Sequence, residues 1–275
     1  FRSSSCFLVF QPAEAIRQFA MALLNDVLFD GQKPDYALGV HVWNSLPSGT
    51  FCINPGSLMA GSGTFELTIT GKGGHAALPH QAIDPIAAGA RIVTALQSIA
   101  AQNVNPLEAA VVGVTMFHAG TASNIIPEQA ELQGTIRFFS RDMWTLLCER
   151  LTRITLDTAS ASGCRVELKL LESTPPLIND AFAANAAQTA LKEILPDAKL
   201  LTDYRTMGSE DMAYFLEQVP GVFIFVGSGG AGNHSAYPHH HPCFDIDENV
   251  LASASALLLQ TAYELQHTAA TEKAP

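Results

Sequence analysis

The feature of the sequence that most constrains its fold is a change in the pattern of its strands near residue 60. Before that point, the segments 6–10 (CFLVF) and 35–43 (DYALGVHVW) are almost continuously apolar. Strands that are buried on both faces of a parallel sheet have this pattern. The segment 64–70 (TFELTIT) instead alternates apolar and polar residues, as a strand with one exposed face does. One chain therefore contains the strands of two different kinds of sheet.

The elements expected around these strands divide the chain into two domains. After 64–70 we expect a helix from about Asp84 to about Ala101, strands over 109–117 and 130–139, a helix over 142–160 and a strand over 164–172. This order, β-α-β-β-α-β, is that of a ferredoxin-like unit. Helices and apolar strands alternate again beyond residue 174, as they do in an α/β fold. The sequence predicts a discontinuous α/β domain, residues 1–60 and 175–275, interrupted by an inserted α+β domain, residues 61–174.

Composition excludes several classes of function. The chain has 26 acidic and 15 basic residues and a net charge of -11, which argues against nucleic-acid and membrane-surface partners. Its five cysteines form no C-x-x-C pair, which favours a reducing, cytoplasmic location over a disulfide framework. No apolar run is long enough to span a bilayer. Because the chain has no initial Met and begins close to an apolar strand, we expect that a portion precedes it.

Two polar residues lie at the ends of the early strands. Glu14 follows the first strand within QPAE, and His41 lies near the end of the second, within HVW. Ligands of open α/β sheets bind at the carboxyl ends of strands, where a carboxylate and an imidazole together could hold a metal. The alternatives are a helix-terminal role for Glu14 and a packed core role for His41.

A glycine-rich segment, 71–80 (GKGGHAALPH), displays His75 on a tight bend. Its spacing matches neither of the glycine-rich phosphate-binding motifs, so we do not expect a nucleotide here. An exposed histidine at this position could instead donate a hydrogen bond to a developing oxyanion.

Asn124 and Arg137 form a further pair of candidate residues, in GTASNIIP and GTIRFF. A guanidinium binds a carboxylate through two parallel hydrogen bonds, so the pair could clamp a substrate carboxylate. Alternatively, Asn124 forms a turn and Arg137 is a surface charge on a half-exposed strand.

Four histidines lie close together near the C-terminus, at positions 234, 239, 240 and 241. Outside a helix, consecutive side chains point in different directions, so at most one or two of the three adjacent histidines can face one metal ion. Helix capping explains Ser209 and part of the acidity of the segment that follows it, and Glu210 could alternatively line a cleft.

The ordered segments FQPAE, HVW, GKGGHAALPH, ASNIIP, GTIRFF, MGSEDMAYF and HHPCFDID resemble the M20 metallopeptidase and amidohydrolase family, and most closely its aminoacylase, hippurate hydrolase and auxin-conjugate hydrolase branch. The resemblance covers essentially the whole chain. It implies a metal-binding α/β catalytic domain with an inserted ferredoxin-like lid that usually dimerises. It also implies hydrolysis of the amide bond of N-acyl amino acids or similar conjugates by a metal-activated water.

Roles for individual residues follow from the same resemblance. Glu14 matches the general base, and His75 matches the lid histidine that stabilises the oxyanion, often across a dimer. Asn124 and Arg137 resemble the residues that hold the substrate carboxylate. The implied metal ligands are His41 and His240, and Zn, Mn, Co and Ni all suit such a site.

The sequence departs from the family pattern in two places. Ala15 stands where the family has a second glutamate that ligates metal, and an upstream segment that carries a cysteine and a histidine ligand is not part of the chain. An alternative hypothesis is therefore an inactive relative that acts as a binding or dimerisation protein.

Overall fold

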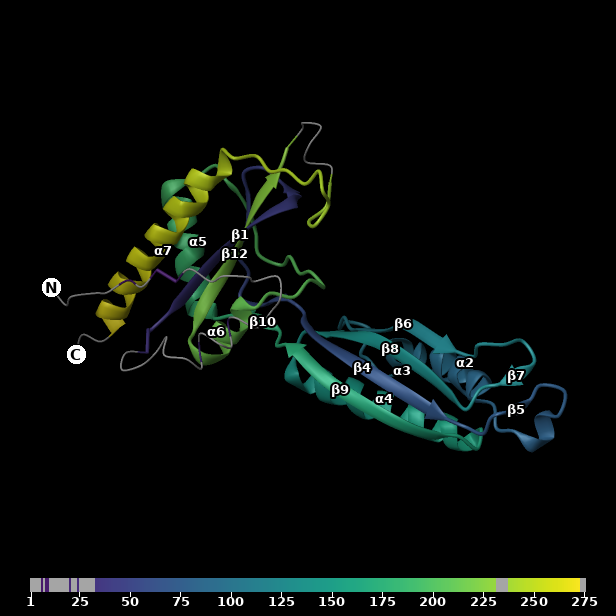
Figure 1. Ribbon diagram of the computed structural model, residues 1–275. Helices are drawn as coiled ribbons and strands as arrows, with labels where there is room; N and C mark the ends of the chain where they lie inside the picture. The colour runs from purple at the N-terminus through teal and green to yellow at the C-terminus, as the bar shows by residue number, and fades with distance from the viewer. Residues whose placement is uncertain are drawn as a thin grey trace. The chain divides into compact units, whose positions relative to one another are not determined.

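The computed structural model describes residues 33–230 and 237–272, together with Cys6, Leu8, Val9, Ala20 and Leu24. The chain has a mixed α/β fold, as predicted, and forms two compact units (Figure 1). Unit 1 comprises Phe1–Met59, Leu177–Thr206 and Glu210–Pro275, and unit 2 comprises Ala60–Pro176 and Met207–Ser209.

Unit 1 contains a four-stranded sheet with the strand order β1-β12-β2-β11. Its strands are β1 (Ala37–Pro47), β2 (Thr50–Cys52), β11 (Lys199–Leu201) and β12 (Gly221–Gly229). The central pair, β1 and β12, is parallel, with His41 opposite Phe225, whereas β12 and β2 are antiparallel. The carboxyl ends of β1 and β12 therefore lie at the same edge of the sheet.

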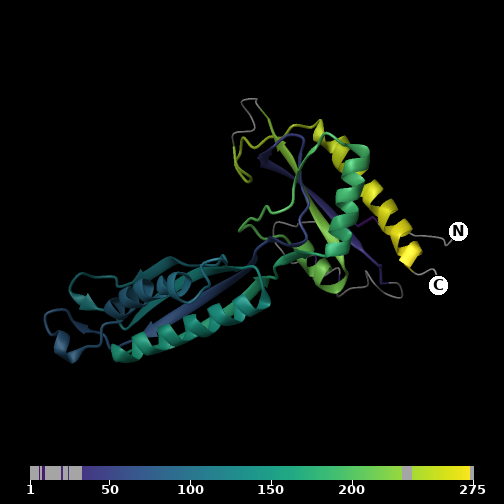
Figure 2. The same ribbon diagram turned by 180° about the vertical axis from the view of Figure 1, so that it is seen from behind.

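The two faces of this sheet are covered by different elements. The long helices α5 (Ala181–Ile194) and α7 (Val250–Glu272) pack side by side against one face, where alternate residues of β12 such as Val222 and Ile224 are fully buried (Figure 2). The other face carries the short helix α6 (Met212–Gln218) and the strand pair β3 (Gly56–Met59) and β10 (Leu177–Asn179).

Unit 2 contains an antiparallel sheet with the order β6-β8-β4-β9. Its strands are β4 (Gly61–Thr70), β6 (Val111–Ala119), β8 (Gln129–Phe138) and β9 (Arg165–Thr174). Helices α2 (Pro85–Leu96), α3 (Ser98–Gln102) and α4 (Arg141–Ala161) connect the strands and enclose the core, so the elements follow the predicted order β-α-β-β-α-β.

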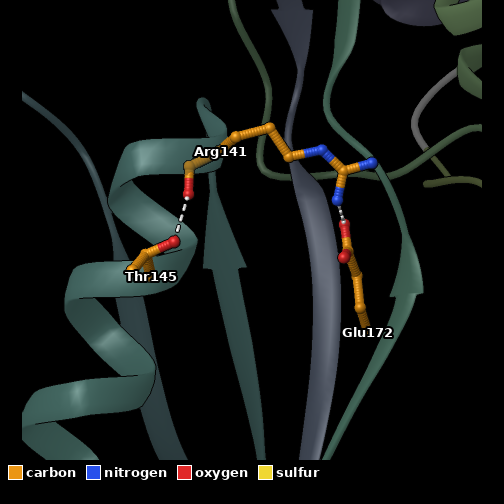
Figure 3. A network of polar contacts seen from close by, with 3 residues as sticks. All are labelled: Arg141, Thr145 and Glu172. Atoms are coloured by element: carbon orange, nitrogen blue, oxygen red, sulfur yellow. Dashed lines mark hydrogen bonds and ion pairs between the residues drawn. The ribbon is translucent and has the colours of Figure 1, made fainter.

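Local sequence explains why these elements begin where they do. Asp84 accepts hydrogen bonds from the backbone N–H groups of Ile86 and Ala87 and is followed by Pro85, which favours the first turn of α2. Ser140 caps α4 in the same way. The next residue, Arg141, forms an ion pair with Glu172 of β9, which fastens the start of α4 to the edge of the sheet (Figure 3).

Most of the predicted elements are present, with shifts of a few residues at their ends. The helix predicted over 84–101 is divided at Gln97 into α2 and α3. The apolar spacing of Phe19, Leu23, Leu24 and Val27 also predicts a helix over 16–29, where only Ala20 and Leu24 are described, and both are helical. The buried strand predicted over 6–10 is not found at its described residues, because Leu8 is 81% exposed and belongs to no strand. No helix in the described parts of the chain combines the length and apolar character needed to cross a membrane.

Candidate functional site

His41 is the fifth residue of β1, two residues before the regular parallel pairing with β12 ends at Trp43, and it lies on the face of the sheet that carries α6. Its Nδ1 is 2.6 Å from the backbone carbonyl oxygen of Val42, and its ring makes edge contacts with Trp43, Phe223 and Phe225. These aromatic side chains project from alternate positions of the parallel pair β1 and β12. His41 is therefore held in a half-buried aromatic environment close to the point where the regular pairing of β1 with β12 ends.

The loop that follows β12 places one of the three consecutive histidines against this group. The ring of His239 packs on Trp43, with ring centroids 4.6 Å apart, and its centroid is 5.5 Å from that of His41. Its Nε2 lies 3.3 Å from the carbonyl oxygen of Val42. Burial lowers the pKa of His239 below its usual value, since desolvation disfavours the charged imidazolium.

The other two histidines of the run are placed differently. His240 is exposed and has a backbone φ of 70°, in the left-handed region that non-glycine residues adopt only sparingly. His241 stacks on Tyr237, and its Nδ1 accepts a hydrogen bond from the backbone N–H of Cys243. His234 lies outside the described residues.

Trp43 contacts most of the aromatic side chains around His41. Its ring stacks on that of Phe225 at a centroid distance of 4.3 Å and packs against His239 in a tilted arrangement, and its Nε1 donates to the hydroxyl of Tyr204. The indole ring thereby connects β1, β12, the chain before α6 and the loop after β12.

The imidazoles of His41 and His239 are of a kind that binds transition-metal ions, but they do not make a complete site. Two imidazoles are ordinary ligands of Zn, Co and Ni. Within residues 33–230 and 237–272, however, no three His, Cys, Asp or Glu side chains come together as ligands of one ion. A zinc site normally takes three protein ligands, so a complete site would need a further donor. Glu14 and Ala15 lie outside the described residues.

His75 and Asn124 are brought together at one end of unit 2. The two-residue strands β5 (Gly74–His75) and β7 (Ile125–Ile126) pair with His75 opposite Ile125, and the backbone N–H of Ala76 donates to the carbonyl oxygen of Asn124. Both side chains are exposed and line an open pocket of about 550 Å³. The other residues lining this pocket are Gly73, Gly74, Ile125, Ile126, Pro127 and Glu128.

A hydrogen bond from the backbone sets the chemistry of His75. Its Nδ1 accepts the N–H of Ala77 at 3.1 Å, so in the neutral ring the proton resides on Nε2. The segment before it needs glycine, because a Cβ at Gly71 would overlap with the carbonyl oxygen of Ile83. The glycine-rich bend thus places a histidine that carries its proton on Nε2 in the lining of the pocket.

Arg137 lies at the opposite end of the same sheet. Arg137 pairs with Ser62, near the start of β4. The first residue of β8, Gln129, pairs with Thr70 at the end of β4, and the chain just before Gln129 is β7. From Ala130 to Arg137 an extended strand spans about 23 Å. The structure therefore does not bring Asn124 and Arg137 of one chain together.

The side chain of Arg137 projects from the face of the sheet opposite the buried core. Along β8, Leu132, Gly134 and Ile136 are buried, while the alternate positions are exposed or half-buried. The guanidinium donates hydrogen bonds to the hydroxyl of Thr135 and to the carbonyl oxygen of Ile136.

Reasoning from the sequence missed the contact of His239 with His41 and Trp43. His239 is part of an irregular loop, where no periodicity shows which side chain points inward. The closeness of His41 and Trp43 in the sequence indicated an aromatic environment for His41. It did not indicate that His239 would contact both residues.

Comparison with known proteins shows extensive similarity. The sequence model of the family described as peptidase family M20/M25/M40 matches residues 2–264. N-acetylcysteine deacetylase of Bacillus subtilis (strain 168) is 36% identical over 254 residues, which are 92% of this chain and 64% of the relative. IAA-amino acid hydrolase ILR1-like 4 of Arabidopsis thaliana is 32% identical over 270 residues, 96% of this chain and 61% of the relative.

A solved structure is similar over the same extent. The crystal structure of the Bacillus subtilis YXEP protein, described as a dinuclear metal binding peptidase from the M20 family, has a TM-score of 0.76 and 33% identity. The match covers 92% of this chain and 63% of that protein. The chain thus spans less than two thirds of the length of each of these three proteins.

Proposed function

Because the chain belongs to peptidase family M20/M25/M40, we propose that it forms part of a metal-dependent hydrolase that cleaves the amide bond of an N-acyl amino acid or a similar conjugate. The names of the relatives, a deacetylase of N-acetylcysteine and a hydrolase of IAA-amino acids, support this substrate class. The observation that carries the proposal is the placement of His75, which lines an open pocket and whose Nδ1 accepts a backbone hydrogen bond, so that its proton lies on Nε2.

Each candidate residue has a distinct task in such a hydrolysis. Glu14 accepts a proton from the attacking water and delivers it to the leaving amine. The Nε2–H of His75 donates to the oxygen that becomes negatively charged as the carbonyl carbon turns tetrahedral. Arg137 binds the free carboxylate of the amino acid through its planar guanidinium, which fixes the position of the scissile bond.

A divalent cation (Zn, Mn, Co or Ni), for which His41 and His240 are the proposed ligands in this chain, supplies Lewis acidity when it is bound. The description of a family member as a dinuclear metal binding peptidase supports this assignment. In this scheme unit 1 is the catalytic domain, and unit 2 is the inserted lid.

The separation within unit 2 supports a homodimer. Only a few bonds separate the acyl carbonyl of an N-acyl amino acid from its carboxylate, too few to bridge the distance of about 23 Å that a strand of seven residues spans. His75 and Asn124 of one chain and Arg137 of a second chain therefore act on one substrate, and the two chains associate through unit 2.

Complementation between two inactive variants tests this arrangement. His75→Ala and Arg137→Ala are purified separately, loaded with metal and assayed with an N-acetyl amino acid. Each is expected to be nearly inactive. A mixture that has exchanged subunits is expected to regain about a quarter of wild-type activity, because half of its dimers contain one intact site. If the mixture stays inactive although subunits exchange, the shared site is wrong.

A second candidate function is binding without turnover, favoured by Ala15 at the position of an expected ligand. Wild-type protein that binds an N-acyl amino acid after metal loading but does not hydrolyse it would support this function. Turnover that is lost in Glu14→Gln would exclude it.

A further inference from the structure

Ile125 is an exposed aliphatic residue directly opposite His75. The strands β5 and β7 pair with Ile125 facing His75, and 55% of Ile125 is exposed. A single exposed aliphatic side chain is common on protein surfaces and by itself indicates nothing. Ile125, however, lines the same pocket as His75, where a ligand would remove its apolar surface from water.

The hydrogen bonds of this strand pair place the two side chains close together. The backbone N–H of Ala76 donates to the carbonyl oxygen of Asn124 at 3.0 Å. This bond flanks the pair of His75 and Ile125, which is therefore a non-hydrogen-bonded pair of the antiparallel ladder. Side chains of such a pair lie on the same face, with Cβ atoms roughly 4.5–5.5 Å apart. A ligand that hydrogen-bonds to His75 therefore has Ile125 beside it.

Two glycines keep the backbone beside this pair free of side chains. Gly73 and Gly74 also line the pocket. A Cβ at Gly73 would lie 3.2 Å from the carbonyl oxygen of Ile126, and a Cβ at Gly74 would lie 3.0 Å from Cβ of Ala82, so a larger residue at either position would crowd its neighbours. The pocket of about 550 Å³ is large enough for a chain of several carbon atoms.

The chemistry of the substrate decides which of its groups lies beside Ile125. In the proposed hydrolysis, His75 donates to the oxygen of the scissile carbonyl. The acyl chain is bonded directly to that carbonyl carbon, whereas the side chain of the amino acid lies beyond the amide nitrogen and the α-carbon. The acyl chain is therefore the apolar group nearest to the oxygen that His75 contacts.

We propose that Ile125 is a specificity-determining residue, whose side chain contacts the acyl group of the substrate and favours apolar acyl chains longer than acetyl. The inference rests on the proposed function, because it places the scissile carbonyl at His75. It goes beyond that function by assigning a chemical class to the acyl group and a residue that selects it.

A pair of variants with matched shapes tests the proposal. Valine and threonine are both β-branched and suit a strand, and they differ only in a methyl group that becomes a hydroxyl. In the metal-loaded full chain, kcat/KM is measured for N-hexanoylglycine and for N-acetylglycine. The parent is expected to prefer the hexanoyl substrate. Ile125→Thr should lower this preference by about tenfold, and Ile125→Val, which loses one methylene group, by no more than about fourfold.

Leu171→Thr is the matched control. Leu171 is an aliphatic residue of β9 in the same unit and is 64% exposed, but it is not among the residues that line the pocket. This variant is expected to keep the preference of the parent. N-acetylnorleucine, compared with N-acetylglycine, reports on the side chain of the amino acid, and Ile125→Thr is expected to leave that second preference unchanged.

Binding measurements separate this inference from hydrolysis. Hexanesulfonylglycine and methanesulfonylglycine resist hydrolysis, and their dissociation constants are measured by calorimetry. Tighter binding of the hexane compound by the parent, lost in Ile125→Thr, would support the inference even if neither amide is hydrolysed, a result that would contradict the proposed hydrolase. Hydrolysis of both amides with an unchanged preference in Ile125→Thr would overturn the inference and leave the proposed function standing.

Three further results would overturn the inference. The first is a parent that shows no preference for the hexanoyl substrate and binds both sulfonamides equally. The second is an Ile125→Thr variant that loses its preference for norleucine instead, since Ile125 would then contact the amino acid. The third is an Ile125→Thr variant that dissociates in size-exclusion chromatography, because the side chain would then belong to the contact between chains.

Discussion

The backbone N–H of Ala77 donates a hydrogen bond to Nδ1 of His75, at a distance of 3.1 Å. The two residues belong to one bend, so a local contact fixes the tautomer of an exposed histidine whose Nε2–H is then available to a ligand. Positioned N–H donors of this kind stabilise negative charge that develops on a carbonyl oxygen.

Replacement of His75 should therefore affect catalysis rather than folding. In the metal-loaded enzyme, His75→Ala is expected to lower kcat by about 100-fold to 1,000-fold, the usual effect of removing one oxyanion donor. Because His75 is exposed, the free energy of unfolding should change by less than about 0.5 kcal/mol. Steady-state kinetics and urea unfolding measure the two quantities. His75→Gln retains an N–H donor and should recover part of kcat. An unchanged kcat in His75→Ala would contradict the assigned role.

Two glycines on neighbouring strands of unit 2 should respond very differently to substitution. A Cβ at Gly134 of β8 would overlap with the carbonyl oxygen of Gly113 and with the ring of Phe65, whereas a Cβ at Gly113 would meet only Cγ2 of Thr135, at 4.0 Å. Gly134→Ala is expected to lower the free energy of unfolding by about 2–3 kcal/mol, since the clashing groups are a paired backbone and a buried ring. Gly113→Ala is expected to stay within about 0.5 kcal/mol.

Urea denaturation followed by circular dichroism compares these two variants with the parent. Equal stabilities of Gly134→Ala and Gly113→Ala would show that β6 and β8 do not approach each other as described.

The thiols should divide into reactive and unreactive groups. Burial raises the pKa of Cys52 to about 12 and that of Cys148 to about 11, and it also raises the pKa of Cys164. At pH 8, only about one Cys52 side chain in 10,000 is then the reactive thiolate. A colorimetric disulfide reagent should react rapidly with exposed Cys6 and Cys243 alone, and with all five cysteines in denaturant. Cys243→Ser should remove half of the rapid phase, and a third rapid thiol in the native protein would refute the assignment.

The carboxylate of Asp247 should titrate at unusually low pH. The hydroxyl of Ser48 donates to it at 2.6 Å, and the backbone and side chain of Asn249 donate as well, which lowers its pKa below the ordinary value of 3.8. Because the pKa is lower in the folded state, this interaction favours folding above pH 3.8 and is lost as the pH falls through the folded-state pKa.

Carboxyl-carbon NMR titration measures this pKa directly. Ser48→Ala is expected to shift the pKa of Asp247 upward, towards 3.8, whereas Ser48→Thr, which keeps the hydroxyl, should leave it low. An unchanged pKa in Ser48→Ala would mean that the contact with Ser48 does not favour the ionised form.

Elements whose signals are local were predicted well. Asp84 and Asp180 cap the helices that follow them. The sequence beyond residue 174 also predicts a helix over 181–194, and these are the residues of α5. The alternation in 64–70 correctly identified Phe65, Leu67 and Ile69 as core residues. Capping and periodicity depend on a few neighbouring residues, which is why the sequence alone sufficed for these features.

Contacts between distant segments were harder to foresee. The distance between Asn124 and Arg137 follows only when β8 is treated as an extended strand that carries the chain to the far end of the sheet. The approach of His239 to His41 depends on the path of an irregular loop, which neither capping nor periodicity specifies. The site residues themselves stay predictions, since their roles rest on the resemblance and await the experiments above.

The pairing of Ser62 with Thr174 has a consequence for how such a chain can be rearranged. These residues lie close to the two ends of the main segment of unit 2, so the segment begins and ends on adjacent strands. For the chain on either side, the folded insertion therefore joins two neighbouring positions, as a short hairpin turn does. The entropy lost in bringing these two positions together rises only slowly with the length of the insertion. An engineer could therefore replace Gly61–Pro176 with a tight turn, or transplant it into the hairpin of another protein, and expect each part to fold independently.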